Sequence, residues 1–180
     1  MAELAKTRKP ADKTEPVPPR RISADQMAAL FRSAAFGDVI SVLMCAPKHR
    51  KLSLDALRTF LLPAIANNQF LIAKLRQQDK PGAVAAGVAL WASVSDEVDR
   101  KLRANPGQPL KLTTEEWKSG PHLWLIDLVA PAALTASILD DLENKVARGR
   151  PMAAHIFTAG NEAKITTLQE LREALKKPVS

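Results

Sequence analysis

A run of nine residues from His122 to Ala130, HLWLIDLVA, constrains this chain more than any other segment. Apart from its first residue and Asp127, every position in the run is apolar, so the pattern does not alternate between a buried and an exposed face. A strand with apolar side chains at consecutive positions is typical of a sheet that is covered on both faces. The run therefore predicts a central sheet that lies between two layers of other elements.

Helical segments with recognisable start signals surround this run. Ser23 with Gln26 forms a capping box, and Ser53 is placed to cap a later helix that Pro63 closes. Gly37 is expected to divide the first helical segment into two. The expected helices cover residues 23–36, 38–46, 53–63, 95–102, 131–149 and the segment from 166 onward, and a short helical turn is expected at 113–120. The expected strands cover 69–75, 84–93, 122–130 and 152–158.

The order of these elements predicts an α+β fold, with one domain built on a mixed central sheet of about four strands flanked by helices. The first two strands are expected to form a hairpin. This domain spans residues 22–180. Residues 1–21 contain four prolines, six Lys or Arg and three Asp or Glu, which is the composition of a disordered tail.

Composition excludes several classes of protein. Cys45 is the only cysteine, which excludes an intrachain disulfide and a cysteine-rich metal site. Tyrosine is absent, so stacking surfaces for single-stranded nucleic acid are scarce. The N-terminus lacks the apolar core of a signal peptide, and no apolar run approaches the roughly 20 residues of a membrane span. We therefore expect a cytoplasmic protein with no metal, no nucleic-acid partner and no stable membrane insertion; its net charge of +7 allows an acidic partner.

Asp127 and His49 are the candidates for chemistry. An ionised carboxylate inside an apolar strand is costly unless it is paired, and a histidine with a carboxylate is the minimum set of a general-base dyad. The alternatives are that Asp127 only accepts backbone N–H bonds at a strand end, and that His49 is an exposed loop residue. The other two histidines, His122 and His155, are expected to be structural.

Several short segments, over roughly residues 36–157, resemble in order and spacing the RTX toxin-activating lysine acyltransferases. They are PKHR at 47–50, LPAI at 62–65 followed by Asn68-Gln69, the strand end Trp91-Ala92, EWKSG at 116–120, and WLID at 124–127 followed by Ala130-Pro131. The chain departs from the family pattern at Ala46, where many members carry serine, in some 36 additional residues at its start, and in the region after residue 157.

This resemblance implies a GNAT-like fold and an acyltransferase with no bound cofactor. The implied reaction moves a fatty acyl group from acyl carrier protein to internal lysines of an RTX-type protein, and a homodimer is a further expectation. The resemblance assigns catalysis to His49 and Asp127. The chemistry agrees, because a lysine amine must lose a proton before it attacks a thioester, and a histidine oriented by an aspartate can take that proton.

Three neighbours of His49 have further expected roles. Lys48 and Arg50 are expected to dock the acidic carrier protein. Cys45 could be a thiol nucleophile, but its place at the end of an apolar helix favours a small buried side chain. Two other functions stay open: a non-catalytic binding protein or chaperone for an RTX protein or for acyl carrier protein, and a nucleic-acid-binding protein, which rests on basic charge alone.

Overall fold

The computed structural model describes residues 22–76, 82–106, 108, 111–157 and 162–176. The expected tail at 1–21 and the expected hairpin turn at 79–82, except for its last residue, lie outside them. The elements are α1 (Ala24–Cys45), α2 (Leu54–Ala66), β1 (Phe70–Arg76), β2 (Ala83–Val94), α3 (Asp96–Ala104), β3 (His122–Val129), α4 (Ala132–Asp141), the π-helical turn η1 (Leu142–Ala147), β4 (Met152–Phe157), β5 (Ala163–Thr167) and α5 (Leu168–Lys176).

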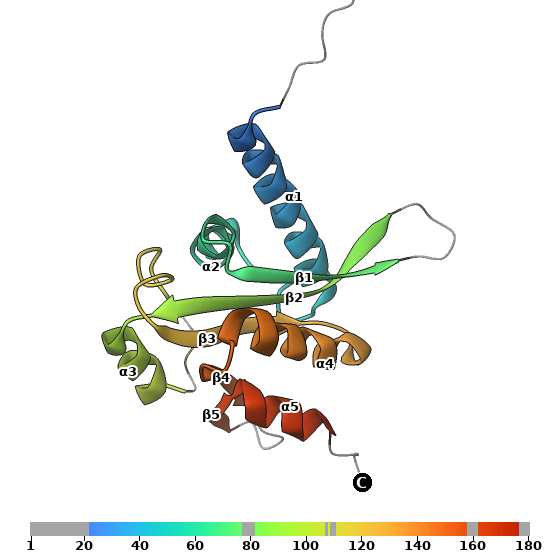
Figure 1. The fold of residues 1–180 in the computed structure, drawn as a ribbon. Coiled ribbons are helices and arrows are strands. Elements are labelled where there is room, and N and C mark those ends of the chain that lie inside the picture. Colours follow the sequence, from blue (N-terminus) through green and yellow to red (C-terminus); the bar gives the residue numbers. More distant parts are fainter. Residues whose placement is uncertain (1–21, 77–81, 107, 109–110, 158–161, 177–180) are drawn as a thin grey trace, which may run out of the picture.

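The five strands form one mixed sheet in the order β1-β2-β3-β4-β5. Neighbouring strands are antiparallel except β3 and β4, which are parallel and are joined by the crossover through α4 and η1 (Figure 1). The predicted class, α+β with a mixed sheet in a single domain, is therefore confirmed, as is the hairpin of β1 and β2.

Helices cover both faces of this sheet, as the apolar run in β3 predicted. The first core joins α1, α2 and α3 to one face, where Val39, Leu61 and Leu102 belong to the same cluster as Trp124 of β3. The second core joins α4 and α5 to the other face, which contains Leu125. Successive residues of β3 thus contribute to different cores, and we call these two surfaces the α1–α2 face and the α4–α5 face.

Two expected helix breaks are absent. Residues 24–45 form one helix through Gly37, with the capping box of Ser23 and Gln26 at its start. Likewise α2 continues through Pro63 to Ala66. A glycine costs a helix only about 1 kcal/mol, and burial of the side chains around both positions outweighs the local penalties.

The C-terminal part of the sheet contains a strand that the sequence pattern did not reveal. Residues 163–167 form β5, which pairs with β4, so the sheet has five strands and not about four. The segment is short and carries Lys164 between small and apolar residues, so its pattern is weak. The last helix accordingly begins at Leu168, where Thr167 accepts a hydrogen bond from the backbone of Glu170.

The EWKSG segment at 116–120 holds the end of β2 in place. Trp117 is buried, and its carbonyl and the N–H of Ser119 pair with the backbone of Ser93. A Cβ atom on Gly120 would lie 2.6 Å from the Cα of Ser95, so only glycine allows this close approach. This part of the family resemblance is therefore structural.

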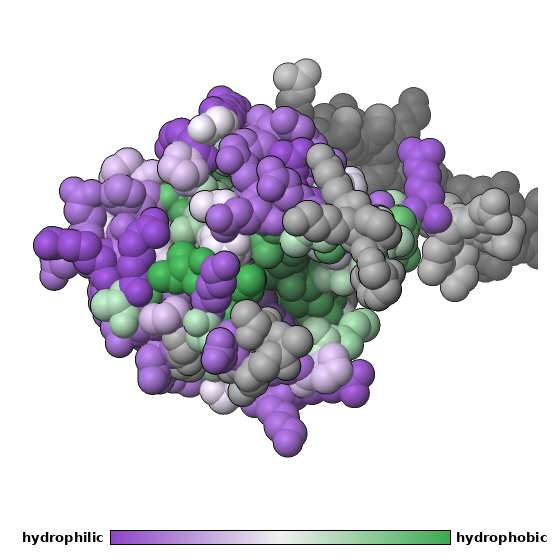
Figure 2. Space-filling view, turned by 90° about the horizontal axis from the view of Figure 1, so that it is seen from below, coloured by the Kyte–Doolittle hydropathy of each residue, from purple (hydrophilic) through white to green (hydrophobic). Residues whose placement is uncertain are grey.

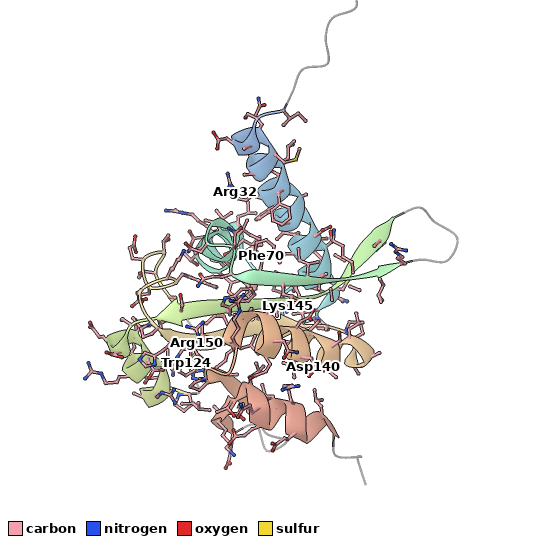
Figure 3. All side chains as sticks on the ribbon, viewed as in Figure 1. Arg32, Phe70, Trp124, Asp140, Lys145 and Arg150 are labelled. Carbon is pink, nitrogen blue, oxygen red and sulfur yellow. The ribbon has the colours of Figure 1, made fainter. Side chains whose placement is uncertain are left out.

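The N-terminal half of α1 extends away from the body of the domain (Figure 1). Its buried residues all lie in its C-terminal half, from Ala35 onward, whereas Met27, Leu30 and Phe31 are exposed. The Phe31 ring contacts Phe70 at the start of β1, which Figure 3 labels beside this helix. Among the described helices, α1 is long and apolar enough to span a membrane by length and composition, a test that core helices and signal sequences also meet. The expectation from the sequence that no apolar run approaches the length of a membrane span was therefore wrong.

Candidate active site

A β-bulge in β3 directs Asp127 toward the α1–α2 face. Leu125 is paired with Trp91 and Asp127 with Leu90, so Ile126 has no partner on β2. Ile126 packs in the core of the α1–α2 face, and without the bulge the next residue would point to the opposite face. Because the bulge adds one residue, Asp127 points to the same face as Ile126.

His49 is held above that face by the loop between α1 and α2. The helix ends at Cys45 as Pro47 predicted, and two backbone hydrogen bonds shape the turn that follows, from His49 N–H to the carbonyl of Ala46 and from Leu52 N–H to the carbonyl of His49. The imidazole stacks on Phe60 of α2, with ring centroids 6.1 Å apart. Backbone and ring contacts therefore fix both the position and the tilt of the imidazole.

The two predicted catalytic side chains meet. His49 Nε2 lies 2.7 Å from Asp127 Oδ2, and the two side chains are only 10% and 5% exposed. The atoms are within hydrogen-bond distance, but they do not form a hydrogen bond of regular geometry. Nε2 faces the carboxylate, so Nδ1 is the ring nitrogen left for another partner.

Asp127 has two further partners. Its Oδ1 lies 2.5 Å from Lys48 Nζ and accepts a hydrogen bond of 3.0 Å from the backbone N–H of Leu128. Burial raises the pKa of the Asp127 carboxyl, but the contacts with His49 and Lys48 outweigh burial and hold that pKa below its ordinary value. The carboxylate is therefore ionised at neutral pH although it is buried.

The pair lies in an apolar cleft of about 830 Å³. The cleft opens where β3 and β4 separate, because the parallel pairing ends at Leu125 and Ala154. Its wall combines Lys48, His49 and Asp127 with mostly apolar side chains from β3, β4, α2, α5 and the segment after α3: Phe60, Pro106, Gln108, Leu125, Ile126, Leu128, Ala154, His155, Ile156 and Leu171. Seen from below, Figure 2 shows an apolar hollow bordered by polar side chains.

His155 also lines this cleft, a position that the sequence analysis did not predict for it. Its Nε2 donates to the carbonyl of Leu102 at 3.2 Å, and its ring meets the edge of Trp124, labelled in Figure 3. Burial lowers the pKa of His155, and the bond to Leu102 opposes this shift only in part. A neutral ring that packs against Trp124 agrees with the predicted structural role, but its place in the cleft wall could not be read from sequence spacing.

The other residues predicted to have roles near His49 lie in different places. Lys48 turns inward to Asp127, whereas Arg50 is exposed and donates from Nε to the carbonyl of Met44. Cys45 is exposed, so the expectation that it is buried was wrong; helix α1 presents it to solvent, and it is not among the residues that line the cleft. Within the described ranges, no group of three or more His, Cys, Asp or Glu side chains could hold a metal ion.

Comparison with known proteins shows the family of this chain. Residues 29–170 match the model of the RTX toxin acyltransferase family. The chain is 36% identical over 95 residues to the leukotoxin-activating lysine-acyltransferase of a Pasteurella haemolytica-like strain, covering 53% of this chain and 52% of that protein. It is 31% identical over 116 residues to the RTX-I toxin-activating lysine-acyltransferase of Actinobacillus pleuropneumoniae, covering 62% of each.

A third relative comes from a cyanobacterium. A protein of Synechocystis that is named only as uncharacterized is 27% identical over 110 residues, which cover 61% of this chain and 70% of that protein. Across these relatives the chain spans between about half and 70% of their length.

Proposed function

Because this chain belongs to the RTX toxin acyltransferase family, we propose that it transfers a fatty acyl group to lysine side chains of an RTX-type protein, with acyl-acyl carrier protein as the donor. The observation that carries the proposal is the buried contact of His49 with Asp127, 2.7 Å long, at an apolar cleft. The proposal includes a GNAT-like fold, in which the donor enters between the parallel strands β3 and β4.

In the proposed reaction His49 acts as the general base. It removes a proton from the ammonium group of the acceptor lysine, whose nitrogen then attacks the thioester carbon. The C–N bond forms and the C–S bond breaks. Of the two protons that the nitrogen loses on becoming an amide, His49 passes one to the departing carrier thiolate, and the other is released to solvent. Asp127, ionised and fixed on Nε2, orients the ring and stabilises the imidazolium.

The apolar wall of the cleft supports a fatty acyl chain as the transferred group. Leu125, Leu128, Ile156 and Leu171 form an apolar surface next to the catalytic pair. Burial of a methylene group there contributes about 0.8 kcal/mol, so a long chain is held in the cleft without polar contacts. Beyond the bulge at Ile126, backbone N–H groups that face the gap between β3 and β4 are the candidates to bind the oxyanion.

For the carrier protein, we propose docking at the loop that holds His49. Arg50 is exposed there, and acyl carrier proteins are acidic. Arg50→Glu should raise the KM for acyl-acyl carrier protein and weaken binding more at low salt, with kcat unchanged. The docking role predicted for Lys48 stays a prediction. Unchanged KM in Arg50→Glu would move the docking surface elsewhere.

The proposal also covers assembly and location. The exposed apolar side chains of α1, namely Met27, Leu30 and Phe31, offer a surface that a second copy could bury in a homodimer. Delivery of the acyl group by acyl carrier protein places the reaction in the cytoplasm. Sedimentation of the wild-type chain against Phe31→Asp tests the homodimer, because a charge on that surface should lower the mass to that of the monomer.

The test of the activity is acylation of a lysine in a protein substrate. The chain is co-expressed with an RTX-type protein encoded near it, and the lysines of that protein are analysed by mass spectrometry. Acylated lysines should appear with the wild-type chain and with His122→Gln, and should be absent with His49→Gln. Equal acylation with His49→Gln and wild type would refute the catalytic proposal. Binding of the RTX-type protein without any acylation would support the binding protein or chaperone instead.

A further inference from the structure

Lys48 differs from the other basic residues of its loop in the position of its charged group. Its side chain is 61% exposed, yet Nζ lies 2.5 Å from Oδ1 of Asp127, a carboxylate whose side chain is only 5% exposed. By contrast, Arg50 and Lys51 of the same loop are exposed and neither has a described contact with Asp127. The amine of Lys48 therefore reaches inward from the surface to the catalytic pair.

The contacts of Asp127 divide between its two oxygens. Oδ1 receives the Lys48 ammonium and the N–H of Leu128, and Oδ2 faces Nε2 of His49. A carboxylate rotates readily about its last torsion, which is broad and has two-fold symmetry. Without Lys48, the N–H of Leu128 would be the only described contact left on Oδ1. Lys48 therefore supplies the second contact that keeps Oδ2 toward the imidazole.

We propose that Lys48 is a positioning residue, which holds the Asp127 carboxylate in the rotation that presents Oδ2 to His49 and places a positive charge beside the pair. The proposal rests on the proposed acyl transfer and assigns to Lys48 a role different from carrier docking.

The experiment compares Lys48→Met, which keeps the length of the side chain but removes its charge, with Lys48→Arg and with the control Lys51→Met. Lys51 is an exposed lysine of the same loop, so Lys51→Met makes the same change in net charge. Acyl transfer from myristoyl-acyl carrier protein to the RTX-type protein is measured as a function of the concentration of the carrier.

Lys48→Met should lower kcat by roughly ten- to hundredfold, since small misplacements of catalytic groups have effects of this order. The KM for the carrier should change by less than about twofold, because Lys48 acts on the catalytic pair and does not bind the carrier. Lys48→Arg should recover most of kcat, and Lys51→Met should match the wild type. A raised KM with unchanged kcat in Lys48→Met would make Lys48 a docking residue and overturn the proposal.

A second measurement does not depend on activity. The ring protons of His49 are compared by NMR at neutral pH in the wild-type chain, Lys48→Met and Lys51→Met. Their chemical shifts should change in Lys48→Met alone, because only that variant frees the carboxylate beside the imidazole. If the wild-type chain transfers no acyl group, the proposed function fails, and this comparison still tests the role of Lys48. Identical chemical shifts in all three proteins would overturn the positioning role.

Discussion

Two contacts between a histidine and an aspartate occur among the described residues, and they are similar in distance but different in burial and in their other partners. His49 lies 2.7 Å from Asp127, and His122 lies 2.5 Å from Asp96 at the start of α3. The first pair is 10% and 5% exposed, whereas the second is 39% and 83% exposed. A short distance alone therefore does not define a catalytic pair.

The surroundings separate the two pairs. Asp127 is also bound by Lys48 and by the N–H of Leu128, and its pair borders the apolar cleft between β3 and β4. Asp96 is open to water, where an ion pair contributes at most about 1 kcal/mol and is screened by salt. The comparison teaches that burial and additional fixed contacts, which restrict orientation and exclude water, turn a histidine and a carboxylate into a candidate base.

Removal of each imidazole should give the largest difference in acylation rate between the two pairs. His49→Gln should lower lysine acylation by roughly 10³-fold or more, because the general base is lost. His122→Gln should stay within about twofold of the wild type. Rates are measured with purified protein, and circular dichroism checks that both variants are folded. Equal losses in the two variants would remove the distinction between the pairs.

Substitution of the two carboxylates should give the next largest difference. Asp127→Asn should reduce acylation by roughly 10²-fold or more, since the amide neither stabilises an imidazolium nor selects the same tautomer. Asp96→Asn should change the rate by less than about twofold. The kcat of each variant is compared with that of the wild type. A wild-type rate in Asp127→Asn would leave His49 without its predicted partner.

Unfolding at acid pH should distinguish the two carboxylates by their effect on the stability of the protein. The pKa of Asp127 is held below its ordinary value despite burial, so its ionised form favours the folded state. This stability is fully present above the pKa of the unfolded state, about 4, and is lost as pH falls through the lower pKa of the folded state. The free energy of unfolding is measured with urea at pH 7 and at pH 3. It should decrease less between these two pH values in Asp127→Asn than in the wild type. Asp96→Asn should lose as much as the wild type.

Cys45 gives the smallest expected effect. It lies four residues from His49 in the sequence, but it is exposed and outside the cleft wall. Cys45→Ala should keep acylation within about twofold of the wild type. A thioester on Cys45 that is detected by mass spectrometry and then consumed to give product would contradict this expectation. Cys45 would then be a nucleophile although it lies outside the cleft wall.

Local signals predicted much of the fold. Ser23, Ser53 and Ser95 begin their helices as their capping patterns indicated, and β1 and β2 form the expected hairpin. Failures occurred where packing overrides local preference, as in the continuous helix through Gly37 and the continuation of α2 past Pro63. Such penalties of one to about three kcal/mol are offset when the flanking side chains are buried.

The sequence by itself determined that β3 is covered on both faces and that Asp127 inside it needs a partner, because apolar periodicity and the cost of a buried charge are local properties. Only the tertiary structure decided which partner it meets. The bulge at Ile126 sets the face on which Asp127 appears, and the turn of the α1–α2 loop brings His49 and Lys48 onto that carboxylate. Strand register and loop path depend on pairing between residues far apart in the chain, and for that reason no local pattern encodes them.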